Sequence, residues 1–62
     1  MKLLSEYFSD DANRIAQIYQ EVYQDKKEFV IKLIDKLKPN MDVEYAVNSE
    51  DYAESVAEDW VS

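Results

Sequence analysis

The sequence predicts a small all-α protein, a bundle of three or four short helices in which residues 1–62 form a single domain. Three observations favour this class. Apolar residues recur at helical spacing in two long stretches, serine precedes paired acidic residues at two places, and the one proline follows an apolar stripe. A domain of this length buries only about 60% of its unfolded surface, so we expect a thin core.

The first part of the chain is predicted to form one short and one longer helix. Apolar residues at positions 3, 4, 7 and 8 fit one or two helical turns. Ser9 is placed to cap a helix whose first turn carries Asp10 and Asp11. The stripe that follows is spaced i, i+3, i+4, i+7 and i+8, and it consists of Ile15, Ile18, Tyr19, Val22 and Tyr23.

A second apolar stripe predicts helix as far as Pro39. Asp25, with Glu28 three residues later, resembles a capping box, so either a second helix begins there or one long helix runs from about residue 10 to 38. Pro39 cannot continue a helix and is expected to end it. The stripe consists of Phe29, Val30, Leu33, Ile34 and Leu37, with Ile31 beside it.

Residues 41–47 alternate between apolar and less apolar positions, which is the period of a strand. Because no second strand is evident to pair with it, we favour a short helix capped by Asn40, or an irregular connector, over an extended segment. A last helix is expected after Ser49, which is placed as N-cap ahead of Glu50 and Asp51. Its apolar stripe is Tyr52, Ala53, Val56, Ala57, Trp60 and Val61.

The charge of the chain is concentrated at its C-terminal end. The formal net charge is −7, and residues 40–62 contain no Lys or Arg, whereas acids and bases balance in residues 1–39. Such a field attracts basic surfaces and repels phosphate backbones and anionic lipid, which argues against direct binding of nucleic acid or membrane. No targeting segment or membrane span is evident, and the initiating Met suggests a complete chain, so we expect a cytoplasmic protein.

The residue types argue against an enzyme. The chain has no Cys, His or Gly, which removes thiolate nucleophiles, imidazole bases and the loops that cradle phosphate. The carboxylates of residues 42–51 lack the spacing of an EF-hand loop, so no metal or other cofactor is expected. The sequence therefore predicts a protein that acts by binding.

The acidic residues of the last predicted helix are the first candidates for a binding surface. Glu50, Glu54 and Glu58 recur every four residues, which places them about 6 Å apart along a helix axis. Asp51 and Asp59 lie beside this row. Phosphates advance about 3.4 Å per nucleotide along one DNA strand, so the row presents negative charge at comparable intervals. The alternative is a solvated helix face that only keeps the protein soluble.

Further candidates lie close by in the sequence. Asp42 and Glu44 add negative charge, and Tyr45, Tyr52 and Trp60 combine a large contact area with a polar group, as residues at binding hot spots do. Tyr52 and Trp60 have a second possible role, because aromatic residues at helical spacing also form cores.

Three short segments, Glu44-Tyr45, Ser49 to Glu54 and Ala57-Glu58, together resemble a stretch of the ArdA-type antirestriction proteins. Those proteins are acidic DNA mimics that occupy the DNA groove of restriction enzymes. They are longer than this chain and usually carry a Gly near the tyrosines, where Ala46 or Val47 stands here, so their fold does not transfer. The resemblance, like the similarity to small acidic phage-encoded inhibitors, implies an acidic helix that competes for a DNA-binding protein.

The sequence thus predicts a small acidic regulator or inhibitor that binds a basic surface of a partner protein, with a DNA-binding host enzyme as one such partner. An antitoxin-like neutraliser of a basic toxin would use the same charges. The rival from another class is an assembly module that forms a homodimer through a set of apolar residues, namely Tyr19, Tyr23, Phe29, Val30 and Ile34.

Overall fold

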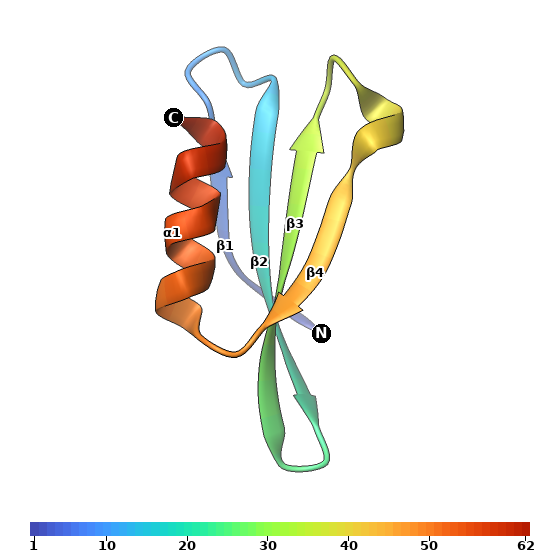
Figure 1. Ribbon diagram of the computed structural model, residues 1–62, viewed down its shortest axis with the longest axis vertical. Coiled ribbons are helices and arrows are strands. Elements are labelled where there is room, and N and C mark those ends of the chain that lie inside the picture. The colour runs from blue at the N-terminus through green and yellow to red at the C-terminus, as the bar shows by residue number, and fades with distance from the viewer.

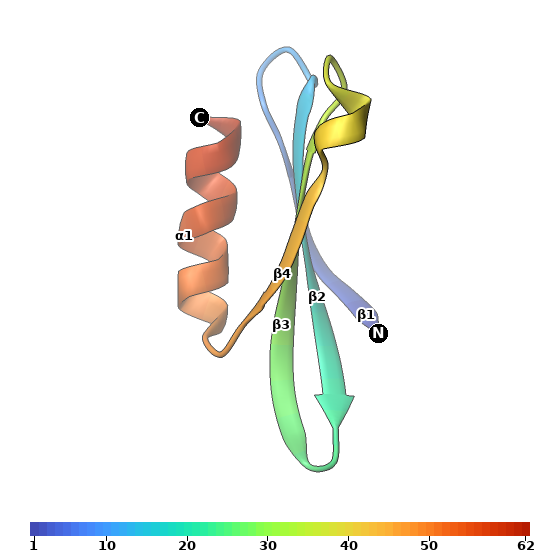
Figure 2. The same cartoon turned by 45° about the vertical axis from the view of Figure 1, so that its right-hand side comes forward.

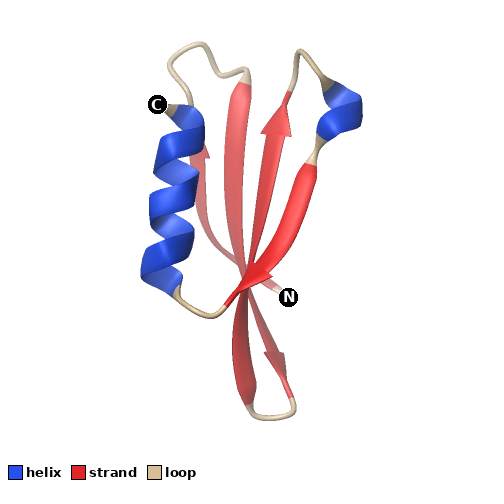
Figure 3. Cartoon of the chain, in the orientation of Figure 1, coloured by secondary structure: helices blue, strands red, loops and turns tan.

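The computed structural model describes residues 1–62 and shows four antiparallel strands followed by one α-helix (Figures 1 and 3). The strands form one sheet in the order β1-β2-β3-β4, so each pairs with its neighbour in the sequence. The prediction of an all-α bundle is therefore wrong. No helix is long and apolar enough to span a membrane. In chain order the elements are β1 (Lys2–Phe8), β2 (Arg14–Tyr23), β3 (Lys26–Asp35), the short 3-10 helix η1 (Pro39–Met41), β4 (Val43–Val47) and α1 (Glu50–Val61).

The two stripes that predicted helices form the central strands β2 and β3. Ala16 and Ile18 of β2 belong to the core beneath α1. Ile15 and Tyr19 alternate with them and therefore point to the opposite face of the sheet. Because both faces of β2 carry apolar side chains, the period of two is hidden and the combined positions imitate helical spacing. β-Branched and aromatic residues, which are frequent in both strands, favour extended backbone.

The N-terminal segment is also extended, contrary to the short helix predicted there. β1 pairs with β2, and an irregularity between Leu3 and Ser5 shifts the register so that Leu4 packs against the core. Ser9 caps no helix and lies instead in the loop between these strands. Its Oγ accepts the backbone N–H of Arg14 at 3.0 Å and donates to Oδ1 of Asp11 at 2.7 Å.

A two-residue turn joins β2 and β3 at the point where the sequence resembled a capping box. Gln24 and Asp25 have φ values of 49° and 67°, both in the left-handed region, between the paired residues Tyr23 and Lys26. Positive φ at both central positions is the requirement of a type I′ hairpin turn, which usually contains Asn-Gly. Without Gly, the sequence does not carry the usual signal for this turn.

Replacing Asp25 by Gly is expected to raise the free energy of unfolding by about 1 kcal/mol, because a side chain at positive φ is strained and Gly is not. Thermal unfolding followed by circular dichroism measures the change. Asp10→Gly is the matched control, because Asp10 is not at positive φ and Gly there should lower stability by a few tenths of a kcal/mol or more. Equal effects of the two substitutions would contradict the assignment of the turn.

The C-terminal part of the chain contains two wrong predictions and one confirmed prediction. β3 ends at Asp35, and Pro39 begins η1 rather than ending a long helix. Residues 43–47 form the strand β4, paired with β3, so the favoured short helix or connector is wrong and the extended alternative is right. The last helix is confirmed: Ser49 is its N-cap, and its Oγ accepts the backbone N–H of Tyr52 at 3.3 Å.

Helix α1 packs on one face of the sheet, and no element covers the other face (Figure 2). Ala53 and Ala57, one turn apart, are completely buried, and their small side chains let the helix lie close to Ile18 and Ile31. We call the side toward α1 the covered face; its buried sheet residues are Ala16, Ile18, Ile31 and Leu33. The uncovered face consists, by strand register, of Leu3, Glu6, Phe8, Ile15, Gln17, Tyr19, Val30, Lys32, Ile34, Glu44 and Ala46.

Candidate functional site

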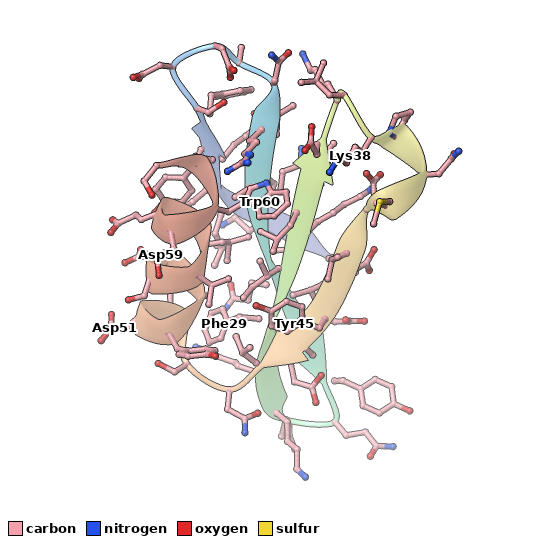
Figure 4. All side chains as sticks on the ribbon, turned by 45° about the horizontal axis from the view of Figure 1, so that its top comes forward. Phe29, Lys38, Tyr45, Asp51, Asp59 and Trp60 are labelled. Atoms are coloured by element: carbon pink, nitrogen blue, oxygen red, sulfur yellow. The ribbon has the colours of Figure 1, made fainter.

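The solvent side of α1 carries a dense set of carboxylates. Four of them, Glu50, Asp51, Glu58 and Asp59, are exposed, and Glu54 is partly exposed. The helix contains no basic residue. Figure 4 shows Asp51 and Asp59 projecting from α1 away from the sheet. We call these five residues the acidic surface, and the structure brings together all the acidic residues that the sequence placed on this helix.

One side of the acidic surface faces β1. Burial raises the pKa of the Tyr7 hydroxyl, and the negative charges of Glu54, Glu58 and Glu50 raise it further. Tyr7 lies on β1 and packs against the core. Helix α1 packs against β1, and the acids that act on this hydroxyl come from three successive helical turns, so the Glu50, Glu54 and Glu58 row lies alongside this strand. The row is therefore held in a fixed direction relative to the sheet.

The aromatic candidates occupy two different environments. Burial raises the pKa of the Tyr45 hydroxyl, with a smaller contribution from Tyr52, so the structure brings these two tyrosines close to each other. Tyr52 is 56% exposed and free to contact a partner. Trp60 is partly buried, and its indole Nε1–H donates to the backbone oxygen of Ile34 at 3.1 Å. Trp60 therefore anchors α1 to the sheet (Figure 4).

Arg14 of β2 contacts the C-terminal end of α1, a role that the sequence does not indicate. Its guanidinium lies 5.4 Å from the centre of the Trp60 ring, and Nη1 is 3.5 Å from the Trp60 backbone oxygen. A cation at this position stacks on the indole and offsets the negative end of the helix. No local pattern marks Arg14 for this role, because its partner lies 46 residues away in the sequence.

The distribution of the acids along α1 is not what helix stability favours. Glu50 and Asp51 lie in the first turn, where the helix dipole stabilises negative charge. Glu58 and Asp59 lie in the last turn, which contains no basic residue, so the dipole opposes them. Two of the five carboxylates of the acidic surface therefore lower the stability of the helix that carries them.

Neutralising Glu58 and Asp59 together, as Glu58→Gln and Asp59→Asn, is expected to raise the free energy of unfolding by roughly 0.5–2 kcal/mol at low ionic strength. The matched pair Glu50→Gln and Asp51→Asn removes the same charge from the other end of the helix and should lower it by a similar amount. Denaturant titration of both double variants measures the difference. Changes of the same sign would show that overall charge, rather than the dipole, decides the effect.

The remaining two acidic candidates lie outside the acidic surface. Asp42 lies between η1 and β4 and is exposed. Glu44 alternates with Tyr45 on β4, and because Tyr45 packs toward the core, Glu44 points to the uncovered face, in register with Lys32. The acidic residues of positions 40–62 therefore do not all lie on one continuous surface.

An open pocket of about 350 Å³ lies beside the loop that joins β1 and β2, next to the C-terminal end of α1. Its main polar groups are already engaged. Asp11 accepts hydrogen bonds from Ser9 and Asn13, and Asp35 accepts the backbone N–H of Leu37. These contacts stabilise the loops, so the pocket is a weaker candidate than the acidic surface.

Comparison with protein-family models, with curated proteins and with solved structures finds no match to this chain. The assignment of function therefore depends on the surface itself. An exposed, base-free helix with a neighbouring exposed tyrosine can attract and contact a cationic surface.

Proposed function

We propose that this protein is a small acidic binding protein of the cytoplasm that occupies a basic surface of a partner protein with its helix α1. The acidic surface supplies the electrostatic attraction and Tyr52 supplies contact area. One observation carries this proposal. Glu58 and Asp59 lie at the C-terminal end of α1, and the helix dipole disfavours negative charge at that end. A helix selected only for stability and solubility would carry acids at its first turn and bases at its last.

The partner class that we propose is a DNA-binding protein. Such proteins hold phosphates with clusters of Lys and Arg, and the Glu50, Glu54 and Glu58 row presents carboxylates about 6 Å apart along the helix axis. The row is part of a folded helix fixed by Trp60 and Arg14, so little ordering is needed on binding. The resemblance of residues 44–58 to ArdA-type antirestriction proteins supports the same class of partner.

The proposal is tested by immobilising the protein and measuring which proteins of a bacterial lysate it retains at low and at high salt. Exposed charges are screened beyond about 8 Å at physiological ionic strength, so retention of the partner should fall steeply as salt rises. Identification by mass spectrometry should yield a protein with a basic, phosphate-binding surface. Retention that does not change with salt would contradict the charge-led mechanism, and a basic toxin as the retained protein would indicate an antitoxin-like role instead.

A further inference from the structure

The uncovered face of the sheet is apolar at both ends and charged across its middle. Strand register places Phe8, Ile15 and Ile34 side by side in one row. A second apolar row, four residues further along the central strands, contains Leu3, Tyr19, Val30 and Ala46. Between them runs a polar row of Glu6, Gln17, Lys32 and Glu44. Leu3 and Phe8 are 45% and 54% exposed, although both are large apolar residues.

We propose that the uncovered face binds the uncovered face of a second copy of this chain. Two sheets that pack face to face form a sandwich, in which the apolar rows of both copies are removed from water. The thin core of each copy, with only seven buried residues, is the situation in which small domains gain stability by association.

The charge distribution favours a second copy over another occupant of this face. The acidic surface lies on α1, on the opposite side of the sheet, so packing through the uncovered faces keeps the two acidic helices apart on the outside (Figure 2). Packing through the covered side would bring like charges together. The uncovered face itself carries both signs, because Lys32 lies in the same row as Glu6 and Glu44.

A two-fold axis that runs parallel to the strands, between β2 and β3, sets the polar rows of the two copies against each other, with one Lys32 beside each pair of facing carboxylates. It places Lys32 opposite Gln17 of the second copy and Glu44 opposite Glu6 of the second copy. Each Lys32 then lies one strand spacing, about 4.8 Å, to the side of Glu44 in its own sheet and of Glu6 in the facing sheet, which is about 10 Å away, so its long side chain can extend toward both carboxylates. Gln17 already donates to Glu6 at 2.7 Å and accepts from the Tyr19 hydroxyl at 2.9 Å, so these polar groups remain hydrogen-bonded in the interface.

The area available predicts a weak dimer. Four strands about 4.8 Å apart and about seven residues long at 3.3 Å each cover about 450 Å² per copy. Twice this area is about 900 Å², slightly below the lower limit of about 1,000–1,200 Å² for specific protein–protein interfaces. We therefore expect a monomer at low micromolar concentration and a dimer as the concentration approaches millimolar.

Sedimentation velocity of the pure protein over this range tests the proposal without any other partner, so its failure is distinguishable from failure of the proposed function. The mass should rise from 7.3 kDa toward twice that value. Leu3→Lys and Phe8→Lys should remain monomeric throughout. Val43→Lys is the matched control, because Val43 is 46% exposed on the covered side of the other edge strand, and this variant should dimerise like the wild type.

A pair of charge reversals tests the arrangement independently of apolar substitutions. Lys32→Glu should weaken the dimer at least tenfold, and adding Glu6→Lys should restore most of the association. A wild type that stays at 7.3 kDa at every concentration would overturn the proposal. Loss of the dimer in Val43→Lys but not in Phe8→Lys would also overturn it, because the interface would then lie on the covered side.

Discussion

Neutralising all five carboxylates of the acidic surface is expected to lower the affinity for a basic partner at least tenfold. The variant replaces Glu50, Glu54 and Glu58 by Gln and Asp51 and Asp59 by Asn. Exposed ion pairs contribute roughly 0.2–1 kcal/mol each, so five of them together contribute about 1–5 kcal/mol, and the middle of this range, about 3 kcal/mol, is well above the 1.4 kcal/mol that corresponds to a factor of ten. Isothermal titration calorimetry or biolayer interferometry with the retained partner measures the loss.

The matched control removes five negative charges from elsewhere in the chain. It replaces acids of residues 1–39, namely Glu6, Asp10, Glu21, Asp25 and Glu28, by the corresponding amides. Both variants lose the same share of the net charge of −7, so any difference between them reflects position rather than overall charge. If the control loses as much affinity as the α1 variant, binding depends on net charge alone and the acidic surface has no specific role.

Replacing Ile31 by Ala is expected to remove a large share of the free energy of unfolding. Ile31 is completely buried at the centre of the core, and truncation of such a side chain costs about 2–5 kcal/mol through lost burial and the cavity that remains. A folded chain of this length is stable by only about 3–9 kcal/mol. Urea titration followed by circular dichroism should show a large fall in the unfolding midpoint.

Ile34→Ala on the same strand is the control for this effect. Ile34 is only partly buried and belongs to the uncovered face, so its truncation should cost about 1 kcal/mol in the monomer. The comparison is made at low micromolar concentration, where self-association is not expected to contribute. Equal losses for Ile31 and Ile34 would contradict the assignment of one covered and one uncovered face.

Helix α1 could be predicted from the sequence because all its signals are local. Ser49 as N-cap, acids in the first turn and an apolar stripe all lie within the element itself. The acidic surface followed directly from that helix. The role of Arg14 at the end of α1 could not be predicted, because it depends on a contact between distant parts of the chain.

The sheet could not be predicted because no single strand shows the usual local pattern, and each strand depends on a partner elsewhere in the chain. Ile15 and Ala16 point to opposite faces, yet both are apolar, so β2 shows no alternation. The turn at Gln24 and Asp25 has the backbone of a type I′ hairpin without its usual Gly. If residues 26–35 are assigned to a helix, the alternating residues of β4 have no strand to pair with, so one wrong assignment leads to another.

Competition with duplex DNA tests most directly whether the acidic surface is a recognition surface. The retained partner is bound to a labelled duplex, and unlabelled protein is added at constant ionic strength while fluorescence anisotropy reports the DNA still bound. The account predicts that the wild type releases the DNA and that the variant with five neutralised carboxylates on α1 fails to do so at the same concentration. Equal release of DNA by both proteins would contradict it.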